Sequence, residues 1–265
     1  MDHPYTLRKF PRSRIASIDT YAVGTRKHHV SAFLEFDVTE PRRKLRELRR
    51  KGILISFNGW LIRVIAVVLS RHPEAAAFLY GKRKMILFDQ VNVSTMVEVL
   101  VRGQSVPLPL VVENAQQKSA VEITEEIEQA KKREPTDSPV LSGRRASRSE
   151  RIYYLLPGIV RRLVWIYMLR HPKSVYPRMG NAVVTSVGMM GKINGWFLIR
   201  SIHPVSFGIG SILRKAVVLG EEIRIREMLH MTVLIDHDVI DGAPMVRVLN
   251  DLAHIIESGA EMDRV

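Results

Sequence analysis

The sequence predicts one α/β domain in which helices cover a mixed β-sheet. Runs rich in β-branched residues alternate with runs whose apolar residues recur at helical spacing, and we find no internal repeat. The chain has 265 residues, of which 46% are apolar, so it is long enough to bury one sizeable core. Because 25% of the residues are charged and apolar residues recur throughout, we exclude a disordered or fibrous protein.

The first part of the chain predicts an N-terminal arm, a strand and two helices. Residues 1–28 are basic and contain prolines, which is typical of an arm. Residues 29–38 alternate apolar and polar side chains, as a half-buried strand does. Thr39 is the expected N-cap of a short basic helix over residues 42–52. Residues 57–70 are apolar nearly all round, which indicates a helix inside the core.

The middle of the chain predicts strands, a helix and then a loop. Residues 81–101 contain two β-rich runs separated by a turn, which predict a hairpin or two adjacent strands. Residues 107–115 are extended, and residues 118–133 carry glutamates before lysines, as an exposed helix does. Residues 134–150 are rich in Pro, Ser, Asp and Arg without apolar periodicity, and therefore predict a loop.

Residues 151–172 combine a dense apolar run with a pair of arginines. We expect a helix over residues 157–170 that packs in the core or at a subunit interface, since apolar helical faces in soluble proteins are usually buried. The less favoured alternative is contact with an anionic membrane surface through residues 152–170, with Trp165 and Tyr167 at the interface.

The last third predicts strands that lead to a final helix. Residues 181–195 form a β-rich run and a turn, and residues 205–212 form a second β-rich run. Residues 224–235 form a long alternating strand that enters a turn containing a histidine. Residues 243–258 show helical spacing, and we expect Gly259 to end this helix.

The composition excludes several classes of protein. The absence of cysteine rules out a disulfide framework, a thiolate metal site and a cysteine nucleophile. The formal net charge of +13 predicts attraction to polyanions, among which are phosphate-bearing cofactors. We find no nucleic-acid recognition motif and expect no nucleic-acid partner. No apolar run reaches the roughly 18 residues of a membrane-spanning helix, and no signal peptide is evident, so we expect a cytoplasmic protein.

His237 is the strongest candidate for chemistry, because it follows a predicted strand in the string DHDVIDG and stands among Asp236, Asp238 and Asp241. A nearby carboxylate can orient the imidazole so that one ring nitrogen accepts a proton. A metal site built from the same residues is a rival hypothesis, although no ligand pair at helical spacing supports it, and we expect no metal. An ordinary Asp-Gly turn is the third interpretation.

Several motifs resemble the catalytic domain of the dihydrolipoyl acyltransferases of 2-oxoacid dehydrogenase complexes, within the chloramphenicol acetyltransferase-like superfamily. DHDVIDGAPMVRVLNDL is similar to the family's C-terminal DHxxxDG signature. The other motifs occur in the family's order: HHVSAFLEFDVT, LIRVIAVVLSRHPEAAAFL, VNVSTMVEV, PLPLVVENAQQKSAVEITEEI and AVVTSVGMMG. The resemblance implies the superfamily's fold, a mixed β-sheet sandwiched by helices in a subunit that forms trimers.

The resemblance also implies transfer of an acyl group between coenzyme A and a thiol carrier such as dihydrolipoamide. His237 would accept the thiol proton, since a base of pKa about 6 to 7 suits a thiol of pKa about 8.5. Asp241 would hold the geometry of the site. Thr185, where the family has serine, would donate a hydrogen bond to the developing oxyanion. The implied cofactor-binding positions are Ser186, Gly188 and Gly242, the last of which we expect to allow a sharp turn.

The sequence departs from the family's usual pattern in three places. We expect a stand-alone catalytic domain without a lipoyl or subunit-binding domain, so that any lipoyl group belongs to a separate carrier protein. Residues 134–178 exceed the family's connection at this place and predict an inserted loop with an apolar helix. The polar C-terminus predicts a homotrimer, with sites between subunits, rather than a large cage.

These departures leave a second hypothesis open. A trimeric paralogue with weak or no activity would serve as a structural or regulatory binding platform, and Thr185 together with the missing lipoyl domain favours it. The complete DHxxxDG string favours an acyl-CoA-dependent acyltransferase. For such an enzyme the expected partner is a separate protein that carries a lipoyl or phosphopantetheine group.

Overall fold

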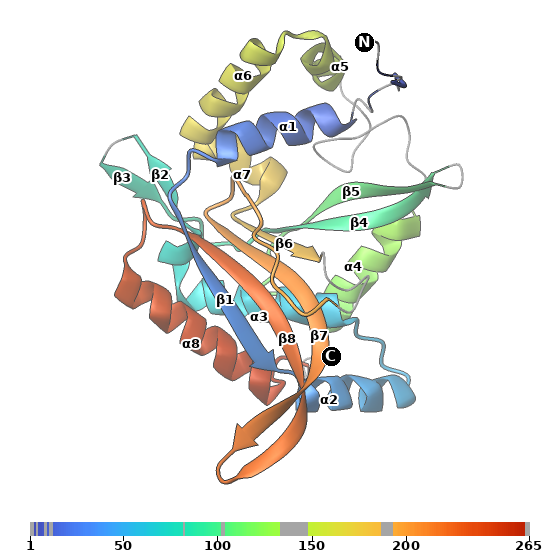
Figure 1. The fold of residues 1–265 in the computed structure, drawn as a ribbon. Helices are drawn as coiled ribbons and strands as arrows, with labels where there is room; N and C mark the ends of the chain where they lie inside the picture. The colour runs from blue at the N-terminus through green and yellow to red at the C-terminus, as the bar shows by residue number, and fades with distance from the viewer. Residues whose placement is uncertain are drawn as a thin grey trace.

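The computed structural model describes residues 3, 5–7, 10, 13–81, 83–101, 104–132, 148–186 and 193–262. In these residues the chain forms a six-stranded sheet, a two-stranded sheet and two groups of helices. One group packs on a face of the large sheet, and the other lies at one end of it, at the top of Figure 1. The predicted α/β fold class is confirmed.

The large sheet is mixed, because β6 runs parallel to both of its neighbours while the remaining pairs are antiparallel. Its strands in spatial order are β1 (His29–Asp37), β8 (Glu222–Asp236), β7 (Val205–Leu219), β6 (Ala182–Ser186), β4 (Val93–Val101) and β5 (Gln104–Val112). The small sheet consists of β2 (Phe78–Tyr80) and β3 (Lys84–Ile86).

The described residues also form α-helices, which are labelled in chain order. They are α1 (Ser13–Gly24), α2 (Thr39–Arg50), α3 (Phe57–Arg71), α4 (Ala120–Lys132), α5 (Arg148–Leu155), α6 (Gly158–Arg170), α7 (Pro172–Met179) and α8 (Gly242–Ser258). A short 3-10 turn spans Pro73–Ala76. The predicted ends of α2 and α8 are confirmed, since Gly52 and Gly259 both adopt the positive φ that favours glycine.

The main core lies between the large sheet and helices α3, α4 and α8. Helix α3 is buried nearly all round, as its sequence predicts, and Ser56 caps its first turn by accepting a hydrogen bond from Gly59 N at 3.0 Å. A Cβ on Gly59 would lie only 2.3 Å from Thr124 Oγ1. Glycine is therefore required where α3 approaches α4.

The longest strands, β7 and β8, form an antiparallel hairpin that carries the predicted histidine turn at its far end. Gly220, with φ of 63°, makes the turn between them, and the tip of the hairpin projects beyond the sheet (Figure 1). Their inner halves are buried next to β1 and β6. The end of β8 is thus held between β1 and β7, and the residues after it start from a fixed position.

Three local predictions are wrong. The two β-rich runs of residues 81–101 are not neighbours: β3 pairs with β2, while β4 pairs with β5 and β6. Between them Phe88 stacks on Tyr176 at a ring distance of 3.8 Å, which directs the chain away. Thr39 lies inside α2 and does not cap it, because its hydroxyl binds Asp37 and the backbone of β8. The expected N-terminal arm contains helix α1.

The segment after α4 also differs in part from expectation. Most of the predicted loop, residues 134–147, lies outside the described residues, and α5 begins at Arg148. Helix α6 occupies the predicted range, and Trp165 is 2% exposed and packs inward, so the less favoured alternative, which placed Trp165 at a membrane interface, is wrong for this residue. Within the described part of the chain, no helix is both long and apolar enough to cross a bilayer.

Candidate functional site

The backbone around His237 is tied to the start of β1. Asp236 N donates a hydrogen bond to Pro204 O at 2.9 Å, and His237 N donates to His28 O at 3.0 Å. Both bonds continue the pairing of β8 with its neighbours by one step. The first residue of the turn therefore has a fixed backbone, even though its side chain is exposed.

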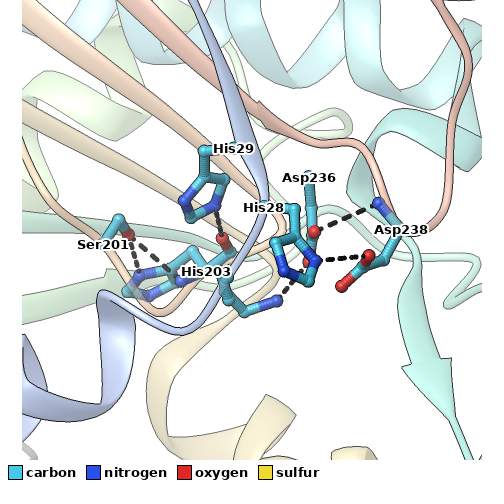
Figure 2. Close-up of polar contacts among 7 residues, drawn as sticks. His28, His29, Ser201, His203, Asp236 and Asp238 are labelled. Carbon is cyan, nitrogen blue, oxygen red and sulfur yellow. Dashed lines mark hydrogen bonds and ion pairs between the residues drawn. The ribbon is translucent and has the colours of Figure 1, made fainter.

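A buried carboxylate braces this turn from below. Asp236 is 1% exposed, and it accepts hydrogen bonds from Lys27 Nζ and, at 3.3 Å, from Asp238 N (Figure 2). The ion pair neutralises the buried charge, and the second bond closes the turn over His237. Sequence analysis did not identify Lys27, because its partner lies 209 residues away.

A second contact holds the turn at its surface. His28 Nδ1 lies 2.8 Å from Asp238 Oδ1, and this hydrogen bond, assisted by the charge of Asp238, raises the pKa of the exposed His28 (Figure 2). The last residue of β8 and the second residue after it thus pair with the two residues before β1. They leave the imidazole of His237 outside the network.

Two other histidines at this end of the sheet are structural. His29 Nε2 donates to His203 O at 2.9 Å, and burial lowers the pKa of His29. His203 Nε2 lies 3.0 Å from Met179 O, and His203 Nδ1 lies 3.2 Å from Ser201 Oγ (Figure 2). Burial lowers the pKa of His203 to about 4. Both rings are neutral at neutral pH and donate to carbonyl groups, and His203 has partners at both ring nitrogens, so His203 is not free to act as a base.

The carboxylates next to His237 do not orient its ring, contrary to the expectation from sequence. The carboxylate of Asp236 pairs with Lys27, and that of Asp238 pairs with His28. Among the described residues, the imidazole of His237 has no hydrogen-bond partner, and no group of three His, Asp or Glu side chains is suited to hold a metal ion.

Asp241 and Gly242 begin helix α8. Asp241 is the N-cap in backbone conformation, but its exposed carboxylate makes no capping hydrogen bond. Its charge nevertheless lies at the positive end of a 17-residue helix. Gly242 has no positive φ, and a Cβ there would meet nothing within 4 Å. The expected sharp turn at Gly242 is therefore wrong, because this residue is simply the first of the helix.

Thr185 and Ser186 end the short strand β6. Val184 lies in the core, so alternation places Thr185 on the opposite face of the sheet. Ser186 Oγ is buried and has no hydrogen-bond partner among the described residues. Gly188, the third residue expected here, lies outside the described residues.

Within one chain, Thr185 and His237 are far apart. The strand register places Thr185 beside Gly208 of β7 and Gly208 beside Thr232 of β8, five residues before His237. With about 3.3 Å per residue along a strand and about 4.8 Å between strands, the two side chains are roughly 15 to 20 Å apart. One chain alone cannot use both residues on the same atom.

A protein-family model now identifies the chain. The model of the 2-oxoacid dehydrogenases acyltransferase catalytic domain matches residues 22–137 and 178–263, which include the strands, the histidine turn and α8. The chain belongs to this family. The resemblance recognised from its motifs is thereby confirmed, and residues 138–177 are not matched by the model.

Individual relatives agree with this assignment. The chain is 24% identical over 214 residues to the dihydrolipoyllysine-residue acetyltransferase component of the pyruvate dehydrogenase complex of Rickettsia bellii, covering 80% of this chain. It spans only 42% of that relative's length. Its fold resembles a probable dihydrolipoamide acetyltransferase from Listeria monocytogenes, with a TM-score of 0.70, 18% identity and 98% of each chain covered.

A second solved structure with this fold is the dihydrolipoamide acetyltransferase of Azotobacter vinelandii. It gives a TM-score of 0.67 and 17% identity over 95% of this chain and 92% of that one. A serine, a histidine and an asparagine were studied there for their roles in the catalytic mechanism. At these identities the likeness establishes the fold, and the chemistry of this chain is argued separately below.

Proposed function

We propose that this protein transfers an acyl group between coenzyme A and a thiol acceptor of the dihydrolipoamide type. The observation that carries the proposal is the place of His237: its imidazole is exposed, in a turn braced on both sides, within the segment matched by an acyltransferase family model. A fixed backbone with an open side chain is the arrangement that a general base requires.

In the proposed step His237 removes the proton from the attacking thiol. The thiolate adds to the thioester carbonyl carbon, and the departing thiolate takes the proton back from the imidazolium when the tetrahedral species collapses. The bond to one sulfur forms and the bond to the other breaks, with no net change of charge. Positioned proton transfer of this kind contributes about 10² to 10⁴ in rate.

The second proposed group is the hydroxyl of Thr185, which would donate a hydrogen bond to the oxyanion. Because Thr185 lies far from His237 in one chain, the proposal places the two residues on neighbouring copies of a homotrimer, with the reaction between them. Asp241, whose exposed carboxylate has no capping bond, would help to fix the geometry across this interface. Ser186, Gly188 and Gly242 remain candidates for contact with coenzyme A.

Coenzyme A fits the charge of the chain, since its phosphates are bound well by arginine and lysine, of which there are 40. The proposed acceptor is a lipoyl group on a separate protein, in keeping with relatives that are components of a pyruvate dehydrogenase complex. A phosphopantetheine arm is the alternative carrier. Placement of the protein in the cytoplasm also stays a prediction.

A thioester-exchange assay tests the proposal. A panel of acyl-CoAs is offered to free dihydrolipoamide with the wild type and with His237→Ala, and folding of both is checked by circular dichroism. We expect the substitution to lower kcat by about 10² to 10⁴ without loss of folding. His254→Ala is the matched control, because His254 is an exposed histidine of α8 that takes no part in the contacts around the turn.

Equal rates in the wild type and His237→Ala would contradict the proposal. If neither protein showed activity and coenzyme A still bound, the second hypothesis would gain support: an inactive trimeric paralogue that acts as a structural or regulatory platform. Thr185, at a position where the sequence resemblance implies serine, is the residue that favours it.

A further inference from the structure

Helices α1, α5, α6 and α7 form a layer with its own core. Its buried apolar residues are separate from the core beneath the sheet; they are Ala16, Val23, Tyr153, Trp165 and Ile202. The family model begins at residue 22 and leaves residues 138–177 unmatched, so most of this layer lies outside the matched domain. A function of the layer need not be acyl transfer.

Polar contacts fix the inner face of α6. Arg161 Nε donates to the buried Asp19 carboxylate of α1 at 2.6 Å, and Tyr153 Oη donates to the same oxygen at 2.8 Å. Trp165 Nε1 donates to Tyr153 Oη at 2.9 Å. These contacts set the rotation of α6 about its axis, and with it the set of residues that faces outward.

The outer face of α6 is apolar as well. Ile159, Leu163 and Tyr167 follow one another at four-residue spacing and are 74%, 58% and 63% exposed. Leu155, at the end of α5, is 80% exposed. An apolar stripe of this length is unusual on the free surface of a helix, since it leaves large side chains in water.

The charges that flank the stripe on α6 have one sign, whereas α5 contains one acidic residue, Glu150, near its start. Arg162 and Arg170 each follow a residue of the stripe by three positions, so they flank it, and both are exposed; Arg162 also lies 3.9 Å from the Asp19 carboxylate. Helices α6 and α7 contain no Asp or Glu, and Asp19, the only acid of α1, is buried in its ion pairs. The exposed apolar tip of the β7–β8 hairpin, by contrast, carries Glu222 beside Arg224.

We propose that the outer face of α5 and α6 docks on the surface of an anionic lipid bilayer. Ile159 and Leu163 enter the boundary between headgroups and acyl chains, Tyr167 lies at the level of the headgroups, and Arg162 and Arg170 bind lipid phosphates. An apolar stripe flanked by arginines, on a helix that itself contains no Asp or Glu, suits an interfacial helix. A neutral or basic protein surface would not complement the charge.

Vesicle sedimentation tests the proposal with the full chain. The probes are vesicles of phosphatidylcholine alone and of phosphatidylcholine mixed with phosphatidylglycerol. We expect binding to the mixed vesicles only, weakened by high salt. Leu163→Glu lowers the partition coefficient at least about tenfold, since it replaces an apolar side chain that enters the lipid by a charge that the lipid repels. Leu54→Glu, at a leucine 62% exposed between α2 and α3, leaves binding unchanged.

Other results would overturn the proposal. These are an equal loss of vesicle binding in Leu163→Glu and Leu54→Glu, no binding by the wild type, or equal binding to both kinds of vesicle. If Leu163→Glu instead lowers the mass of the assembly in analytical ultracentrifugation, the face joins copies of this chain. Ile159→Glu repeats the test at a second exposed position. Thioester exchange is measured in parallel, and its retention in Leu163→Glu separates this proposal from the acyltransferase one.

Discussion

Lys27 and Asp236 show how single residues position His237 without touching its ring. Their ion pair lies beneath the turn, and Asp236 also receives Asp238 N, so the backbone on both sides of His237 is held. The predicted role of carboxylates near His237 was to orient the imidazole. In the structure they orient the turn instead, because Lys27 and His28 lie closer to them.

We predict that Lys27→Met lowers the free energy of unfolding by about 2 to 3 kcal/mol, because Asp236 is then buried without its cation. Part of the loss is offset because Lys27 is itself 18% exposed, which lets water reach the pair. Urea denaturation measures the change. Lys131→Met is the matched control, since its pair with Glu128 is exposed and contributes about 0 to 1 kcal/mol. Equal effects at the two positions would contradict the role assigned to Lys27.

A second residue-scale prediction concerns pH. The unfolded chain takes up a proton at His203 below pH 6.5, whereas the folded chain does so only near pH 4. The free energy of unfolding therefore falls as the pH decreases through this window, by about 3 kcal/mol from His203 alone.

His203→Gln removes this titration and keeps an amide donor for Met179 O. We expect the difference in stability between wild type and variant to shrink as the pH falls from 7 to 4, as measured by denaturation at each pH. Carboxylates titrate alike in both proteins and cancel in the difference. A difference that does not vary with pH would show that folding leaves the pKa of His203 unchanged.

At the scale of elements, the sequence predicts best those segments whose pattern is imposed by the main core. Helix α3 is apolar all round because it is buried all round, and β8 alternates until it enters the centre of the sheet. Helices α1, α5 and α7 escaped prediction. They are short, and they bury only a few residues against one another.

We predict that the layer of α1, α5, α6 and α7 opens separately from the sheet. Asp19→Ala removes the acceptor of Arg161 and of Tyr153, so the layer loses about 2 to 4 kcal/mol of local stability. Hydrogen exchange should then quicken in α1 and α6 while α3 keeps its protection. Faster exchange in α3 to the same extent would mean that the layer and the sheet unfold together.

At the scale of the whole molecule, the distance between Thr185 and His237 leads to a prediction about assembly. If neighbouring copies share each site, His237→Ala and Thr185→Ala complement each other when mixed, because one chain supplies the threonine and the other the histidine. Random mixing of equal amounts restores about a quarter of the sites.

The two variants are unfolded, mixed and refolded, and thioester exchange is compared with that of each variant treated alone. Light scattering before and after mixing should give the mass of a trimer, and a mass of 24 or 60 subunits would contradict the predicted absence of a cage. Activity no higher in the mixture than in the separate variants would place both residues in the same chain's site.

The sequence by itself determined the fold class, the order of the main elements, the family and the histidine turn. Those features depend on local periodicity and on a short string, which a chain carries in every conformation. Only the tertiary structure decided that β3 pairs with β2 and not with β4, that Lys27 pairs with Asp236 and that the outer face of α6 is exposed. Each of these depends on contacts between residues far apart in the chain, whose geometry no local pattern contains.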